Sequence, residues 1–80
     1  MQPAEFTQLS TAQQLDILYY QGDILANRYE EEHIFLLYSL HNFYVELRHD
    51  AYTNQLQAVS AFKDTEQLEA YLPYLTEEVL

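Results

Sequence analysis

The stretch that most constrains this chain is residues 34–62, which reads as three consecutive antiparallel strands. Aromatic and β-branched side chains dominate residues 34–40 and 43–49, as is typical of strands on a partly buried sheet. His41 and Asn42 lie between these two runs, and Asn tolerates the left-handed backbone that a two-residue hairpin turn requires. The pattern therefore predicts a β-hairpin that turns at these two residues.

A two-residue turn at residues 41–42 gives a register for this hairpin, and the alternation of apolar side chains supports that register. Because side chains alternate along a strand, the register separates them into two sets, and a slip of one residue would mix the sets. The first face is then almost wholly apolar: Ile34, Leu36, Tyr38, Leu40, Phe43, Val45, Leu47 and His49. The second face is mixed: Phe35, Leu37, Ser39, Tyr44, Glu46 and Arg48.

A third strand is predicted for residues 55–62, after a connection at residues 50–54 that is rich in turn-forming residues. Its alternation assigns one set to the first face: Leu56, Ala58, Ser60 and Phe62. The other set, which includes Val59, then points to the second face. A further strand is predicted for residues 23–30, with Glu30, Glu31 and Glu32 as an exposed turn; an extended loop or a continued helix is the competing interpretation.

One helix is predicted before the strands in the sequence and another after them. Ser10 and Gln13 have the spacing of a capping box for a helix that ends near Gln21, and Gly22 suits a left-handed C-cap. Asp64 is the N-cap expected for a second helix that ends near Tyr71 or Leu72, ahead of Pro73. Residues 1–9 are expected to form a flexible leader.

These elements predict one small α+β domain over residues 1–80. The sheet is an antiparallel meander of three to four strands, and the N-terminal and C-terminal helices pack on one of its faces in a two-layer arrangement.

The composition narrows the classes of function. Three basic and 13 acidic residues give a net charge of −10, which argues against direct binding to nucleic acid or to anionic membranes. Acidity is compatible with a basic protein partner, with mimicry of nucleic acid or simply with solubility. The chain has no cysteine, no apolar run long enough to span a bilayer and no signal-peptide pattern, so a cytoplasmic location is expected.

The sequence shows no pattern typical of catalysis. His33 and His49 lie at the end of the hairpin opposite His41, which argues against a shared metal site. Glu46 is expected to form a structural ion pair with Arg48 or Arg28 rather than to act as an acid or base. A single glycine excludes a glycine-rich phosphate loop. We therefore expect a non-enzymatic protein without a metal or cofactor.

The second face of the sheet is the predicted interaction surface. Two short helices can hardly cover both faces, and an exposed apolar patch usually marks an interface. We expect a homodimer through this face, although the face could also be simply solvated. The expected interface residues are Phe35, Leu37, Tyr44, Glu46, Arg48 and Val59. Pairing through an exposed edge strand would give a different dimer.

An acidic inhibitor or immunity-type protein that binds a basic partner is the alternative hypothesis. Its expected contacts are Glu30, Glu31 and Glu32.

The strand pattern also resembles that of a group of bacterial proteins. The residues that carry the resemblance are the runs 37–40 and 43–47, residues 54–62 and the helix at residues 68–72. These are similar to short uncharacterised proteins from Bacteroidetes-type bacteria, over about residues 10–75. The resemblance implies no activity and no functional residues.

Overall fold

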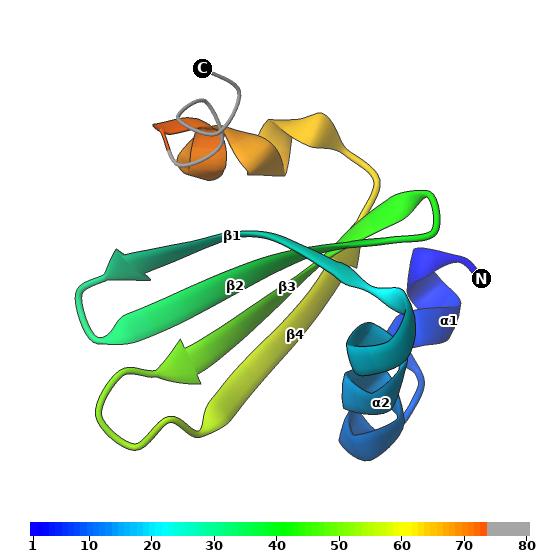
Figure 1. Cartoon of the computed structure of the whole chain (residues 1–80), viewed down its shortest axis with the longest axis horizontal. Helices are drawn as coiled ribbons and strands as arrows, with labels where there is room; N and C mark the ends of the chain where they lie inside the picture. The colour runs from blue at the N-terminus through cyan, green and yellow to red at the C-terminus, as the bar shows by residue number, and fades with distance from the viewer. Residues whose placement is uncertain (74–80) are drawn as a thin grey trace.

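The computed structural model, described here for residues 1–73, is an α+β fold built on a four-stranded antiparallel sheet in the order β1-β2-β3-β4 (Figure 1). Its elements are α1 (Pro3–Thr7), α2 (Thr11–Gln21), β1 (Asp23–Glu30), β2 (His33–Leu40), β3 (Phe43–Asp50), β4 (Leu56–Phe62) and the 3-10 helix η1 (Thr65–Tyr71). The meander confirms the predicted fold class, including the strand at residues 23–30 whose existence the sequence left open.

The central hairpin has the predicted register. Leu40 lies opposite Phe43, and pairing continues without a shift to His33 opposite Asp50. The left-handed turn residue is His41, with φ 55°, rather than the Asn42 that turn preferences favour. The alternation of apolar side chains therefore determined the register, while the turn residues gave only its position.

Strand β4 differs from the sequence prediction. Leu56 lies opposite His49 on the first face, but the register shifts before Ala58, which lies opposite Arg48. This bulge makes Gln57 an extra residue, and an extra residue reverses the direction of every later side chain. The reversal places Val59 on the first face. The expectation that Val59 belongs to the second face was therefore wrong.

The first face carries the larger of two apolar cores. Its buried members come from the N-terminal helices and the two central strands: Phe6, Leu18, Leu40, Phe43, Val45 and Leu47. Residues 1–9 do not form the expected leader, because α1 buries Phe6 completely and the side-chain amide of Gln14 donates to the Phe6 carbonyl oxygen at 2.9 Å. The Phe6 and Phe43 rings meet edge to face, with centroids 6.1 Å apart.

Helix α2 begins and ends as predicted, but its C-cap residue has a different conformation from the one expected. The side chain of Ser10 accepts from the Gln13 amide, and Gln13 reaches back to the Ser10 amide, which confirms the capping box. Gly22 is extended, with φ −88° and ψ 154°, and not left-handed. A glycine is required here by close packing, since a Cβ atom would lie 2.9 Å from the Leu18 carbonyl oxygen.

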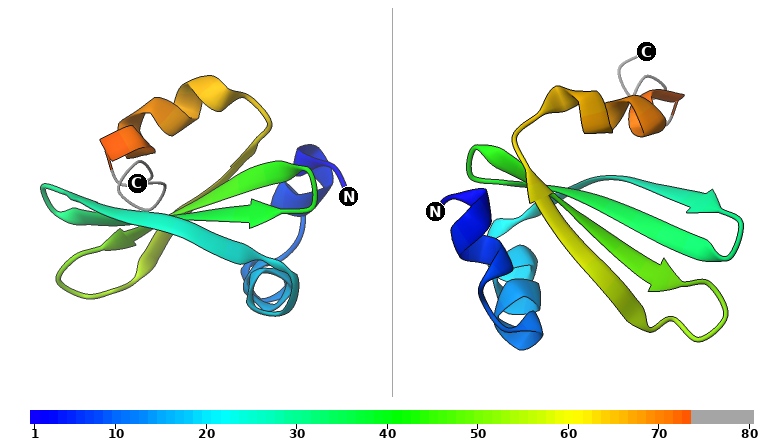
Figure 2. Two further views of the ribbon diagram at one scale, coloured as in Figure 1. Left: turned by 45° about the horizontal axis from the view of Figure 1, so that its top comes forward. Right: turned by 180° about the vertical axis from the view of Figure 1, so that it is seen from behind.

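The C-terminal helix lies on the other side of the sheet from α1 and α2 (Figure 2). Asp64 caps it as predicted, accepting the Glu66 amide at 2.8 Å, but the helix is of the 3-10 type. Its Tyr71 packs with Leu37 and Phe62 on the second face. The expectation that the N-terminal and C-terminal helices pack on the same face was therefore wrong. The β4 bulge explains the difference, because it turns Phe62, the last residue of the strand, toward the second face.

We predict that Phe6→Ala lowers the free energy of unfolding by about 3–5 kcal/mol, because it leaves a cavity between α1 and the first face. Urea denaturation measures the change. Tyr19→Ala is the matched control, since Tyr19 is 81% exposed and its loss should have little effect. Equal stability of the Phe6 variant and the wild type would mean that α1 does not contribute to the core.

Candidate functional site

The second face of the sheet is largely covered. Leu37 is completely buried, and Phe35 and Tyr44 are half-buried against a cluster that contains Tyr71 of η1. Glu46 and Arg48 share this face, as the register predicted. The structure therefore places five of the six expected interface residues on one face, and four of them, all except Arg48, lie in the clusters that contain Tyr71 of η1.

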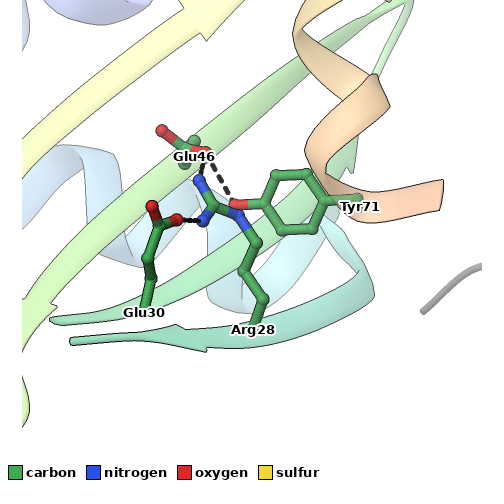
Figure 3. Close-up of polar contacts among 4 residues, drawn as sticks. All are labelled: Arg28, Glu30, Glu46 and Tyr71. Carbon is green, nitrogen blue, oxygen red and sulfur yellow. Dashed lines mark hydrogen bonds and ion pairs between the residues drawn. The ribbon is translucent and has the colours of Figure 1, made fainter. Parts of the chain in front are cut away.

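A polar cluster lies where η1 meets the sheet (Figure 3). The Tyr71 hydroxyl donates to Oε2 of Glu46 at 2.7 Å. Nη2 of Arg28 lies 3.7 Å from the same oxygen, and Nη1 of Arg28 forms an ion pair with Glu30. The two charged groups that contact Tyr71 therefore come from different strands, Arg28 from β1 and Glu46 from β3.

The guanidinium of Arg28 is also enclosed by aromatic rings. Its central carbon lies 4.0 Å from the Phe35 ring centroid and 4.9 Å from that of Tyr71, distances at which a cation is attracted to a ring face. Burial acts to lower the pKa of Arg28, but its hydrogen bonds and charge interactions with Glu30 and Tyr71 raise the pKa overall. Arg28 therefore keeps its charge under η1.

Tyr71 acts in this cluster as a hydrogen-bond donor. Its side chain is fully buried, and burial, followed by the hydrogen bond and negative charge of Glu46, raises its pKa well above the ordinary value. A protonated phenol that donates to a carboxylate is neither a base nor a nucleophile. The geometry thus supports a structural clasp that holds η1 on the sheet.

Arg48 differs from Arg28 in its surroundings. The predicted ion pair of Glu46 forms with Arg28, the second of the two candidates. Nε is buried in both arginines and has no hydrogen-bond partner within the described part of the chain. Arg28, Phe35 and Arg48 lie side by side across β1, β2 and β3, so two of the three basic residues of the chain share one row of the second face.

The acidic turn forms the exposed tip of the β1–β2 hairpin. Glu31 and Glu32 are exposed, whereas Glu30 ends β1 and pairs with Arg28. The Ala51 amide donates to the Glu32 carbonyl oxygen at 2.8 Å, which brings the loop after β3 beside this tip. Asp50 orders that loop by accepting the amides of Thr53 and Tyr52, and these bonds lower the pKa of its carboxyl group.

The three histidines lie apart along the sheet. His33 is opposite Asp50 and His49 is opposite Ile34, on different faces, while His41 is in the turn at the other end of the hairpin. Among residues 1–73, no group of three or more His, Cys, Asp or Glu side chains is placed to hold a metal ion.

The two edges of the sheet differ. Helix α1 packs against β4, while the outer edge of β1 has no paired strand among residues 1–73. Ile24 and Tyr29 of β1 are 58% and 68% exposed. A shallow groove of about 200 Å³ runs along residues 24–27. A larger groove of about 300 Å³ lies between the N-terminal helices and β4, and its lining includes Gln14 and Val59.

Comparison with known proteins gives no relative. No protein-family model matches the sequence, and no curated protein or solved structure shows significant similarity to it. The resemblance to the Bacteroidetes-type proteins therefore stays a prediction. No helix within residues 1–73 is long and apolar enough to cross a membrane.

The clasp was not predicted, although the sequence contains two signals for it. Leu68 and Tyr71 are three residues apart after the Asp64 cap, a spacing that places both on one side of a helical turn. Arg28 falls on the second face once β1 pairs with β2. Neither signal says which face the helix covers, because that depends on the β4 bulge.

We predict that Tyr71→Phe lowers the free energy of unfolding by about 2 kcal/mol, because it removes a hydrogen bond to a charged and partly buried acceptor while keeping the ring. Urea denaturation of Tyr71→Phe, of Glu46→Leu and of the double variant measures the coupling between the two residues. Tyr20→Phe, at a position 78% exposed, is the control. Additive effects of the two substitutions would show that this bond contributes nothing to stability.

Proposed function

We propose that this protein is a non-enzymatic protein–protein interaction module that forms a homodimer through its sheet. The observation that carries the proposal is the open outer edge of β1, which no other strand pairs with among residues 1–73. Such an edge presents a row of backbone N–H and C=O groups that can pair with a strand of another chain. An antiparallel pair of β1 strands from two copies would join two sheets into one.

Because η1 covers the second face, we propose a contact through the edge of β1 instead of through that face. Leu37 is fully buried under η1, so it offers no surface to a partner in this conformation. Strand β1 contains neither Pro nor Lys, the residues that often protect an edge, and Arg28 points inward to the clasp. The bulge between Ile24 and Ala26 interrupts only its beginning. Residues 27–30 are left as a regular segment for pairing.

We predict that the double variant Ile24→Lys/Tyr29→Lys is monomeric under conditions in which the wild type is dimeric, because lysines on paired β1 strands repel each other. Light scattering after size exclusion gives the absolute mass over a range of concentrations. The control is Tyr19→Lys/Tyr52→Lys, which adds the same charge at two positions that are 81% and 80% exposed and lie outside β1.

Two results would contradict the edge dimer. One is a wild-type protein that remains monomeric at the highest concentration. The other is an edge variant that retains the mass of the wild type while the control behaves in the same way.

Binding to a basic protein is a second candidate, favoured by the acidic tip. Glu31 and Glu32 are exposed, and Asp50 lies in the strand end beside them, in a chain with a net charge of −10. Charge complementarity of this kind speeds association and weakens as salt screens it.

We predict that a basic protein recovered with this chain at low salt is released as the salt concentration rises, and that Glu31→Gln/Glu32→Gln weakens its binding. Glu66→Gln/Glu69→Gln removes the same charge from η1 and serves as the control. Binding measured by titration calorimetry separates the two variants. Recovery of no basic protein at low salt, or equal weakening by both variants, would count against the acidic tip.

A further inference from the structure

The C-terminal helix is attached to the sheet by few side chains. Five of the seven residues of η1 are exposed, and only Leu68 and Tyr71 turn toward the sheet. A 3-10 helix of this length is unusual, because its hydrogen bonds are poorly aligned. Residues 63–64 alone join it to β4. Within residues 1–73, η1 is held on the sheet by the apolar contacts of Leu68 and Tyr71, by the bond between Tyr71 and Glu46, and by the Arg28 guanidinium near the Tyr71 ring.

An apolar surface lies directly beneath this helix. It includes the fully buried Leu37, the nearly buried Phe62 and the half-buried Phe35 and Tyr44. The Tyr44 and Phe62 rings are neighbours, with centroids 5.8 Å apart. Exposed together, these side chains would form a contiguous patch of the kind that marks protein interfaces.

We propose that η1 is a displaceable strap over the second face, and that the face it uncovers binds the same face of a second copy of this chain. Charge favours this occupant. By the strand register, Arg28 and Arg48 share this face with Glu30, Glu46 and Asp50, so it holds two basic and three acidic groups in a chain of net charge −10. Two copies can therefore meet here with little net repulsion. Opening also moves the acidic Glu66 and Glu69 of η1 away from the contact.

This surface is distinct from the edge proposed above. An edge dimer pairs the backbone of β1 and leaves η1 in place, whereas the second-face dimer requires η1 to leave. The two therefore differ in their response to substitutions in β1 and in η1, and one can exist without the other.

Thiol labelling tests the opening of the strap directly, because the chain has no cysteine of its own. Leu37→Cys places a thiol under η1, and Val45→Cys places one under the N-terminal helices; both positions are 0% exposed in the central strands. Local opening requires less free energy than global unfolding. We expect the thiol at position 37 to react with a soluble disulfide reagent at least about tenfold faster than the thiol at position 45, under native conditions.

Tyr71→Ala should speed labelling at position 37 further and leave position 45 unchanged. Equal rates at the two positions, or equal acceleration of both by Tyr71→Ala, would overturn the strap. Because each cysteine variant is compared with itself, a general loss of stability is recognised by the rate at position 45.

The absolute mass of variants built on Ile24→Lys/Tyr29→Lys tests whether two copies bind through the second face. When Tyr71→Ala is added to this double variant, the protein should change from monomer to dimer as its concentration rises. Adding Tyr44→Asp to that triple variant should abolish the dimer. A protein that stays monomeric in this triple variant would overturn the second-face contact, whatever the edge itself does in the wild type.

Discussion

The bulge at Gln57 determines which helix covers which face of the sheet. Leu56, before the bulge, lies on the face that simple alternation predicts. After the bulge, every side chain of β4 lies on the face opposite to the one predicted. Val59 then completes the first core beside Leu47, while Phe62 joins the second core with Leu37 and Tyr71. The chain leaves β4 on the side of the second face, where η1 lies.

A sheet with apolar side chains on both faces needs cover on both, and 80 residues allow little of it. Helices α1 and α2 supply the cover on the first face through Phe6 and Leu18. Among residues 1–73, the second face is covered only by the short η1, and a polar clasp supplements the apolar contact. In that clasp Glu46 accepts from Tyr71 and pairs with Arg28, which leaves its negative charge compensated in a partly buried place. Among residues 1–73, no strand covers the outer edge of β1 either.

The parts of the fold that follow from local periodicity could be predicted. The register from Leu40 opposite Phe43 to His33 opposite Asp50 follows from alternation, and the caps at Ser10 and Asp64 from short-range hydrogen bonding. The bulge could not be predicted, because an extra residue in β4 leaves the alternation of small and apolar side chains ambiguous. The cover of the second face and the clasp depend on that bulge and remained hidden with it.

Other differences have local causes. Phe6 lies in a segment with too little periodicity to reveal a helix, and only the packing against Phe43 shows that it belongs to the core. The spacing of Leu15 and Tyr19 suggests an apolar side of α2, yet both are exposed, and the polar Gln14 is buried because it bonds to the Phe6 carbonyl oxygen. Gln14 lies one turn before the buried Leu18, on the side of α2 that meets the first core.

Tyr71 docks η1 on the second face of the sheet, against Arg28 and Phe35. Nuclear Overhauser contacts in the wild-type protein are the first measurement to make of this docking. We expect contacts from the Tyr71 ring protons to the Arg28 side chain, together with upfield shifts of the Arg28 guanidinium protons, since the guanidinium carbon lies 4.0 Å and 4.9 Å from the Phe35 and Tyr71 ring centroids. A Tyr71 ring with no contacts to the sheet and with the shifts of an exposed tyrosine would contradict it.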